Sequence, residues 1–266
     1  MQTFNLWDKV PGLCEETPVL EYYPAENKVT DATVVILPGG GYGMRANHEG
    51  EGYALYLNSI GMDAFVCQYR VSPHRFPLPL LDSRRAIRFV RANAQKFGIN
   101  KDKIAVMGSS AGGHLAALTS TYTAPIDFEG ADEIDNESAA PNATILCYPV
   151  ICSPDSLVAH EGSFVNLLGE GNQPKSAKFS CDKLISDTTP PAFVWHTSDD
   201  GAVNVSNSLR YGEALRNHNI QFEMHIFPSG NHGLGLAQDK PYVSRWAEML
   251  KEWFKNIGFY FTFPKR

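Results

Sequence analysis

Short apolar runs recur along the chain and predict the strands of a sheet. They occupy residues 33–37, 63–69, 103–107, 143–150, 192–196 and 222–227. Most of these runs are unbroken and do not alternate between apolar and polar positions, which is typical of strands covered on both faces. Residues 20–23 predict one further short strand, at an edge of the sheet.

Amphipathic segments fill most of the intervals between these runs. Helices are predicted over residues 80–97, 111–122, 205–218 and 241–257. In the first of them Leu81, Ile87 and Val90 lie on one stripe and the arginines lie mostly off it, while Gly98 is placed to end the helix. Strands that alternate with helices imply crossover connections. The expected fold is therefore α/β, with a mostly parallel central sheet and helices on both faces.

One interval breaks this alternation. Residues 151–191 hold no strong strand pattern and are rich in Ser, Asp, Gly and Pro. A plain loop of this length is uncommon in a compact domain, so we expect a small insertion with one or two short helices, placed over or beside a functional site. No linker composition divides the chain, and a single domain over residues 1–266 is expected.

Composition and charge exclude several classes of protein. A chain of 266 residues that is 43% hydrophobic and 20% charged is neither disordered, collagen-like nor a coiled coil. A net charge of −6 argues against a nucleic-acid partner. No apolar run has the length of a membrane span, and the first residues lack the features of a signal peptide. Five cysteines without a C-x-x-C pair fit a reducing compartment, so a cytoplasmic protein is expected.

Residues 108–112 read G-S-S-A-G and match the G-x-S-x-G motif. The motif is short, but here a predicted strand precedes it and a predicted helix follows it, which is the setting of a nucleophile elbow. The strained turn needs small residues two positions to either side of the serine, and Gly108 and Gly112 satisfy this need. Ser110 is therefore the candidate nucleophile, at a helix N-terminus that favours developing negative charge. The alternative is that Ser109 and Ser110 only cap the helix.

A glycine run, P-G-G-G-Y-G over residues 38–43, follows the first predicted strand. Acyl transfer generates an oxyanion that backbone N–H groups stabilise, and glycines let those groups approach it. We expect the amides of Gly40, Gly41 and Ala111 to form this oxyanion hole. The alternative is a phosphate-binding loop. That loop would open a helix and be followed by an acidic residue near position 60, where Asp63 only begins a strand, and no G-K-[ST] is present.

Two further members of a catalytic triad follow in the chain order Ser, Asp, His. Asp199 and Asp200 come after the fifth apolar run, and His232 comes after the sixth, within G-N-H-G. Catalytic groups gather at the carboxyl ends of strands in open α/β sheets. His232 would take the proton of Ser110 and later return it to the leaving group, while a carboxylate fixes the histidine tautomer. Physical reasoning alone leaves the choice between Asp199 and Asp200 open.

The other histidines carry weaker signals. His196 ends a predicted strand and is a candidate to line the site, whereas His114 and His225 are expected to be structural. The histidines without any supporting context are His48, His74, His160 and His218. No cluster has a metal-ligand spacing such as H-E-x-x-H, so neither a metal nor another cofactor is expected.

Together these segments resemble the α/β-hydrolase esterases, in the branch that holds hormone-sensitive-lipase-like enzymes, bacterial acetyl esterases and acetyl-xylan esterases. The resemblance runs from Val34 to the C-terminus. Residues 38–42 are similar to a P-G-G-G-Y oxyanion loop, residues 108–116 to the elbow of these esterases, and residues 230–233 to their histidine loop.

The same resemblance favours Asp200 over Asp199 as the acid of the triad. Asp200 and Val203 fit a D-x-x-V-P frame, although Asn204 stands where the family has proline. The family implies hydrolysis of small acyl esters, often acetyl groups on sugars, through an acyl-serine intermediate.

The resemblance also implies a substrate class. Few residues precede the strand at 33–37, so the long N-terminal cap of lipase-like enzymes is not expected. We expect a small-molecule acyl ester, an acetylated sugar or xylo-oligosaccharide foremost, with no nucleic-acid or membrane partner, and a homo-oligomer is left open. Tyr42, Trp195 and Phe164 are candidates either to stack on a sugar or to belong to the core.

Three alternatives to a sugar esterase remain open. A general short-chain carboxylesterase would use the same triad without a sugar preference. A peptidase of the prolyl-oligopeptidase type usually carries an added domain, for which 266 residues leave no room. A non-catalytic binding module usually lacks a member of the triad, and here none is missing.

Overall fold

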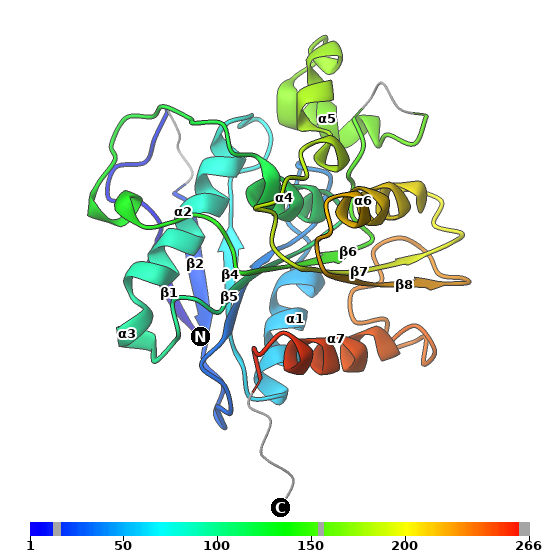
Figure 1. Cartoon of the computed structure of the whole chain (residues 1–266). Helices are drawn as coiled ribbons and strands as arrows, with labels where there is room; N and C mark the ends of the chain where they lie inside the picture. The colour runs from blue at the N-terminus through cyan, green and yellow to red at the C-terminus, as the bar shows by residue number, and fades with distance from the viewer. Residues whose placement is uncertain (13–16, 154–156, 261–266) are drawn as a thin grey trace, which may run out of the picture.

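The computed structural model of the chain describes residues 1–12, 17–153 and 157–260. Its centre is an eight-stranded sheet with the order β1-β2-β4-β3-β5-β6-β7-β8 (Figure 1). The strands are β1 (Gln2–Asn5), β2 (Val19–Tyr23), β3 (Thr33–Leu37), β4 (Asp63–Gln68), β5 (Ile104–Ser109), β6 (Ala143–Cys147), β7 (Ala192–Thr197) and β8 (Phe222–Phe227). From β4 to β8 neighbouring strands are parallel, and only the pairs β1–β2 and β2–β4 are antiparallel. The predicted mostly parallel α/β sheet is confirmed.

The predicted edge position of residues 20–23 is wrong. Strand β2 lies one place in from the edge, because β1 pairs with it outside, with Phe4 opposite Leu20. Strand β1 has four residues, three of them exposed and Phe4 half-buried. Such a short and largely polar segment carries no periodic signal, so the sequence did not predict it.

Seven α-helices and three 3-10 helices flank the sheet in the described residues. They are α1 (Asn47–Ser59), α2 (Leu78–Ala92), α3 (Ala94–Phe97), α4 (Ser110–Thr121), α5 (Glu161–Leu168), α6 (Ser206–Asn217), α7 (Arg245–Asn256), η1 (Glu133–Asn136), η2 (Gln173–Phe179) and η3 (Cys181–Lys183). Helices α1 and α7 cover one face of the sheet, and α2, α4 and α6 cover the other (Figure 1). None of the helices in the described ranges is both long and apolar enough to cross a bilayer.

Three helices differ from the sequence prediction. The helix predicted over residues 80–97 divides at Asn93 into α2 and α3, and Gly98 ends it in the left-handed conformation with φ 61°. Helix α7 begins at Arg245 instead of Pro241. Helix α1 was not predicted, since Gly50 and Gly52 lower the helix propensity of its central turn.

The core has two layers, one on each face of the sheet. Alternate residues of β3 divide between them: Val34 and Ile36 face α1 and α7, whereas Val35 and Leu37 face α2 and α4. The tryptophans divide unequally between the layers. Trp7 packs on the α2 side, while Trp195, Trp246 and Trp253 pack on the α7 side.

Ion pairs of two buried arginines hold α2 against its neighbours. Arg70 and Asp82 are fully buried, and the guanidinium reaches both carboxylate oxygens, at 2.8 and 2.7 Å. The arginines of this helix were predicted to lie mostly off the buried stripe, but Arg85 is buried. It is 1% exposed and pairs with Asp132 and Asp135. A buried guanidinium is stable only when its donors are satisfied, and these carboxylates supply the acceptors.

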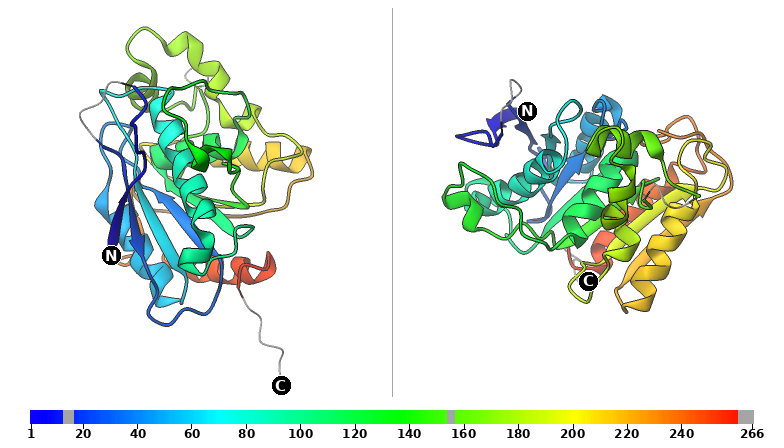
Figure 2. Two further views of the ribbon diagram at one scale, coloured as in Figure 1. Left: turned by 90° about the vertical axis from the view of Figure 1, so that its left-hand side faces the viewer. Right: turned by 90° about the horizontal axis from the view of Figure 1, so that it is seen from above.

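The insertion, residues 151–191, contains α5, η2 and η3, and it lies on the α4 side of the sheet (Figure 2). Phe164 of α5 packs edge-on against His114 of α4, with ring centroids 5.1 Å apart. The carbonyl of Phe179, at the end of η2, lies 2.8 Å from Nε2 of the same histidine. The insertion is therefore built onto the helix that follows the predicted elbow.

All cysteines in the described residues are free and buried, among them Cys67 and Cys147 within strands, as predicted. Cys14 lies outside the described residues.

Candidate active site

The turn between β5 and α4 has the geometry of an elbow. Ser110 is the first residue of α4 and adopts φ 53°, a left-handed conformation that a non-glycine residue rarely takes. A Cβ on Gly108 would lie 2.1 Å from the carbonyl oxygen of Gly112, and a Cβ on Gly112 would lie 2.1 Å from that of Leu37. Only glycine fits at either position, which is why the motif flanks the serine with glycines.

The simple capping interpretation of the two serines does not describe this turn. Ser109 occupies the N-cap position, but no side-chain hydrogen bond caps α4. The Ser109 hydroxyl instead lies 2.8 Å from the hydroxyl of Tyr53, on the α1 face of the sheet. Ser110 points the other way, toward the loop that follows β8.

The structure brings Ser110, His232 and Asp200 into one hydrogen-bonded chain, called the relay below. Nε2 of His232 lies 2.8 Å from Oγ of Ser110, and Nδ1 of His232 lies 2.7 Å from Oδ2 of Asp200. A carboxylate only accepts, so Nδ1 carries the ring proton and Nε2 is free to accept from the serine hydroxyl. This is the tautomer that a general base needs.

Asp200 is held by four donors. Oδ1 accepts the amides of Ala202 and Val203, each at 2.9 Å, and Oδ2 accepts from His232 and from Nε2 of His196 at 3.2 Å. Burial by itself raises the pKa of Asp200. The hydrogen bonds from His196, His232 and the two amides outweigh burial and hold this pKa well below its usual range. The side chain of Asp200 therefore stays a carboxylate.

His196 lies behind the relay and does not line its open side. The ring is fully buried. Nε2 faces two acceptors, Asp200 and the carbonyl of Val203 at 3.0 Å, and Nδ1 lies 2.8 Å from the hydroxyl of Ser208. The Nε2 proton therefore points at Asp200, and Ser208 donates to the other nitrogen.

Asp199 serves a different purpose from Asp200. Its Oδ1 accepts the amide of Gly230 at 2.7 Å, and this bond lowers the pKa of the exposed Asp199 carboxyl. Gly230 belongs to residues 228–235, called the histidine loop below. Asp199 thus anchors that loop, while Asp200 contacts His232 itself.

Residues 38–43 are the predicted oxyanion loop, and this name is kept below. Gly40 and Gly41 have φ angles of 128° and 63°, which L side chains rarely adopt. The carbonyl of Gly40 accepts from the amides of Gly43 and Met44. Within the described part of the chain, the amides of Gly40 and Gly41 themselves have no hydrogen-bond acceptor. The amide of Ala111 lies in the first turn of α4, where helix N–H groups have no partner in the helix.

Two side chains that the sequence analysis did not single out hold the oxyanion loop. Oε2 of Glu49 accepts the amide of Gly39 at 2.8 Å, and Nδ2 of Asn166 donates to the carbonyl of Gly41 at 2.8 Å. Glu49 lies on α1, which was not predicted, and Asn166 lies on α5 within the insertion. The sequence marks Glu49 only as one of two acids, with Glu51, that follow the glycine run.

The insertion also places a histidine, His160, at the start of α5. His160 caps α5, with Nδ1 accepting the amide of Ser163 at 3.3 Å. Burial, and then the charge of His232, lowers the pKa of His160. Helix α5 therefore begins at a half-buried histidine that caps it, and it carries Asn166, which bonds the oxyanion loop. The sequence offered no supporting context for His160.

His114 is structural in its contacts, as expected. It is fully buried, with Nε2 on the carbonyl of Phe179 and Nδ1 2.8 Å from the hydroxyl of Tyr42. Burial lowers its pKa to about 4.

The aromatic candidates for sugar stacking, Tyr42, Trp195 and Phe164, are each 1% exposed or less and belong to the core.

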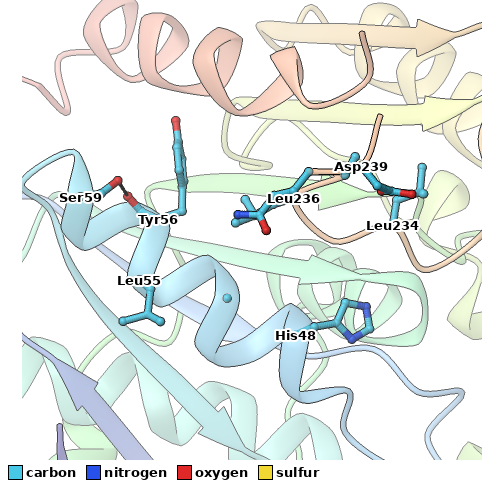
Figure 3. Close-up of a pocket in the computed structure, with 10 residues that line it drawn as sticks. His48, Leu55, Tyr56, Ser59, Leu234, Leu236 and Asp239 are labelled. Atoms are coloured by element: carbon cyan, nitrogen blue, oxygen red, sulfur yellow. Dashed lines mark hydrogen bonds between the residues drawn. The ribbon is translucent and has the colours of Figure 1, made fainter. Parts of the chain in front are cut away.

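A cavity of about 710 Å³ lies beside the histidine loop (Figure 3). Its walls come from α1, with His48 and Tyr56, and from the residues after His232, with Leu234 and Leu236. His48 touches the histidine loop, since its Nε2 lies 2.9 Å from the carbonyl of Gly233. None of the relay residues lines this cavity.

No group of three or more His, Cys, Asp or Glu residues in the described ranges is arranged to hold a metal ion.

Comparison with known proteins identifies the family of the chain. The BD-FAE family model matches residues 21–215, a span that contains the oxyanion loop, the elbow and Asp200. The chain belongs to the BD-FAE family. The α/β-hydrolase fold that the sequence predicted is confirmed.

Two relatives of this BD-FAE chain have names of xylan-related enzymes. It is 37% identical over 235 residues to "Endo-1,4-beta-xylanase B" of Butyrivibrio fibrisolvens and 36% identical over 230 residues to "Acetylxylan esterase" of Xylanibacter ruminicola. These matches cover 86% and 84% of this chain but only 36% and 45% of the relatives, so the chain spans less than half the length of either.

A solved structure matches over nearly its whole length. The acetyl ester-xyloside bifunctional hydrolase from Caldicellulosiruptor lactoaceticus is 43% identical, with a TM-score of 0.91. The match covers 98% of this chain and 97% of that one.

Proposed function

We propose that this chain is a serine carboxylic-ester hydrolase that removes short acyl groups, acetyl foremost, from sugars or xylo-oligosaccharides. The observation that carries the proposal is the relay, with Ser110 2.8 Å from His232 and His232 2.7 Å from Asp200. The unpaired amides of Gly40 and Gly41 support it, because acyl transfer needs donors for an oxyanion.

The first half-reaction forms an acyl-serine. Nε2 of His232 takes the proton of Ser110 as Oγ attacks the ester carbonyl carbon. The carbonyl oxygen becomes an oxyanion, which the amides of Gly40, Gly41 and Ala111 stabilise, with the N-terminus of α4 adding its dipole. The ester C–O bond then breaks, and His232 gives its proton to the leaving alkoxide.

The second half-reaction releases the acid. Water takes the place of the alcohol, His232 removes its proton, and the resulting hydroxide attacks the acyl carbon. Collapse of the second oxyanion returns the proton to Oγ of Ser110 and frees the carboxylic acid. Asp200 accepts a hydrogen bond from Nδ1–H of His232 throughout and stays ionised, so the imidazolium formed in each half is stabilised in place.

The sugar preference rests on the relatives. The acetylxylan esterase of Xylanibacter ruminicola and the acetyl ester-xyloside hydrolase of Caldicellulosiruptor lactoaceticus are similar to this chain at 36% and 43% identity. One observation favours a general short-chain carboxylesterase instead. Tyr42, Trp195 and Phe164 are buried, so none of them presents a ring face on which a sugar could stack.

Hydrolysis of p-nitrophenyl acetate, butyrate and octanoate, measured beside acetate release from acetylated xylo-oligosaccharide, tests the proposal. Ser110→Ala is the blank, and Ser59→Ala, at an exposed position near the end of α1, is the matched control. Fast acetate release with little activity on octanoate supports the sugar esterase. A preference for longer acyl chains with the sugar ester untouched points to the general carboxylesterase. Activity retained in Ser110→Ala would refute the assignment of the nucleophile.

A further inference from the structure

Glu49 is a buried carboxylate in the first turn of α1. It is 2% exposed. Each of its oxygens accepts a different donor: Oε2 accepts the amide of Gly39 at 2.8 Å, and Oε1 accepts the hydroxyl of Tyr148 at 2.6 Å. Gly39 directly precedes the two glycines whose amides are left free for an oxyanion. Glu49 therefore touches the oxyanion loop one residue away from its working amides.

Tyr148 carries the same link to the other loop of the site. Its hydroxyl oxygen accepts the amide of Gly235 at 2.9 Å, three residues after His232. Its ring also packs edge-on against the ring of His232, with centroids 5.1 Å apart. Tyr148 itself adopts φ 37°, an unusual conformation that turns the chain directly after β6.

The backbone around Gly39 has little room to move. A Cβ at this position would lie 2.5 Å from Oε2 of Glu49 and 2.7 Å from the carbonyl oxygen of Ser109. The oxyanion loop is thus pressed between the carboxylate on one side and the elbow on the other. A shift of Glu49 would change the position of the loop relative to Ser110.

We propose that Glu49 is a positioning residue that fixes the oxyanion loop and the histidine loop relative to each other. The path runs from the Gly39 amide to Glu49, to the Tyr148 hydroxyl and to the Gly235 amide. The inference rests on the proposed function, because it assigns Glu49 a task in the same acyl transfer. Glu49 touches neither the substrate nor the reacting atoms; it acts through the two loops.

A carboxylate is the group that this position requires. The Gly39 amide and the Tyr148 hydroxyl are two donors, and a carboxylate offers an acceptor oxygen to each. A carboxamide has one acceptor oxygen and carries no charge. With that oxygen on the Gly39 amide, its NH₂ group would face the Tyr148 hydroxyl, which would have to accept from it and turn its own proton toward the Tyr53 hydroxyl, 3.2 Å away. Glu49→Gln keeps the shape of the side chain, removes the charge that strengthens both hydrogen bonds and reverses the bond to Tyr148.

The direction in which Glu49→Gln changes the acylation rate distinguishes a positioning role from a purely electrostatic one. A negative charge beside the oxyanion hole opposes the charge that develops on the substrate oxygen. If Glu49 acted only through its charge, Glu49→Gln would speed acylation. If Glu49 positions the loops, the same variant slows it.

The test compares Glu49→Gln, Tyr148→Phe and the control Glu51→Gln, which makes the same change at an exposed position of α1. Values of kcat and KM are measured with p-nitrophenyl acetate. The rate of covalent labelling of the purified protein by a p-nitrophenyl phosphonate gives a second readout that needs no turnover, and circular dichroism with a melting curve shows whether each variant folds.

We expect kcat and the labelling rate to fall about 10- to 100-fold in Glu49→Gln, somewhat less than the loss of an oxyanion donor. KM should stay within about twofold, because the substrate contacts are unchanged. Tyr148→Phe should also lower both rates, and the double variant should lose little more than Glu49→Gln alone, since both changes break one path. Glu51→Gln should match the unmodified protein.

Folded Glu49→Gln with an unchanged or faster labelling rate overturns the inference, as does a change confined to KM or to the melting temperature. Should Glu49→Gln fail to fold, Tyr148→Phe decides: an unchanged kcat and labelling rate overturns the inference. If the unmodified protein is labelled by the phosphonate but hydrolyses no ester, the proposed function fails, and the labelling rates of the variants still test Glu49.

Discussion

Asp200 accepts a hydrogen bond from Nδ1–H of His232 at 2.7 Å, while the carboxylate beside it, Asp199, accepts from the amide of Gly230 in the histidine loop. The two neighbouring aspartates therefore have different hydrogen-bond partners, although both follow β7. One contacts the imidazole, and the other holds the backbone that carries the imidazole.

This difference predicts unequal effects of the same substitution. Asp200→Asn should lower kcat by about 10⁴-fold, as the loss of the triad acid does in serine proteases, because the amide favours the wrong histidine tautomer. Asp199→Asn keeps an oxygen that can accept from Gly230, and its kcat should fall by less than about tenfold. Steady-state kinetics with p-nitrophenyl acetate measures both. The reverse ranking would assign the acid to Asp199.

The elbow predicts that Gly112 cannot carry a side chain. In Gly112→Ala the Cβ would lie 2.1 Å from the carbonyl oxygen of Leu37, so α4 must move away from β3. Stability should fall by about 1–3 kcal/mol from overpacking, and kcat by about 100-fold from the misplaced Ser110. Urea unfolding and kinetics measure the two effects.

The matched control for this substitution is Gly52→Ala within α1. No heavy atom lies within 4 Å of a Cβ built there. Alanine should raise stability by about 0.5–1 kcal/mol, because glycine in a helix interior loses more conformational entropy on folding. If the two glycine variants behave alike, the crowding at the elbow is not what requires Gly112.

His114 predicts a loss of stability in mild acid. Its pKa is about 4 in the folded protein against 6.5 ordinarily, so the unfolded chain binds a proton at a pH where the folded protein does not. The stability that His114 contributes is complete above about pH 6.5 and is lost as the pH falls toward 4, by about 3 kcal/mol in total. Urea unfolding of the protein and of His114→Gln at pH 7 and at pH 4.5 isolates this part.

The variant should lose less stability between these two pH values than the unmodified protein. His218→Gln, which changes an exposed histidine, should lose as much as the unmodified protein. Parallel pH dependences for the protein and His114→Gln would contradict the explanation.

The buried pair of Arg70 and Asp82 predicts a large effect on stability without a role in chemistry. Asp82→Asn leaves a buried guanidinium without its counter-ion, and the free energy of unfolding should fall by about 3–5 kcal/mol. Asp187→Asn, at an exposed carboxylate, should change it by less than about 0.5 kcal/mol. Urea unfolding at pH 7 compares the two, and equal values would show that the ion pair adds no stability.

The sequence was most informative where one local rule acts strongly. Unbroken apolar runs located β3 to β7 because these strands are covered on both faces. Gly108 and Gly112 identified the elbow because its close backbone contacts admit no other residue. The choice of Asp200 came from the family resemblance, and its contact with His232 agrees with that choice.

What the sequence did not predict depends on contacts between distant segments. Glu49 and Gly39 are ten residues apart, but Tyr148 and Asn166 meet the site from 99 and 125 positions beyond their partners. Arg85 was expected mostly off the apolar stripe of its helix, yet it is buried and pairs with Asp135 of η1 and with Asp132, the residue that caps η1. No periodicity reports such pairings, since periodicity describes one element at a time.

The unequal division of tryptophans between the two core layers makes each face of the sheet separately visible by fluorescence. Trp195, Trp246 and Trp253 lie on the α7 face and Trp7 on the α2 face, and all are buried. In a Trp7→Phe variant every emitting indole reports from the α7 face. A shift of emission to longer wavelength during unfolding would then show when water enters that layer alone. Comparison with the unmodified protein would show whether the two faces open together.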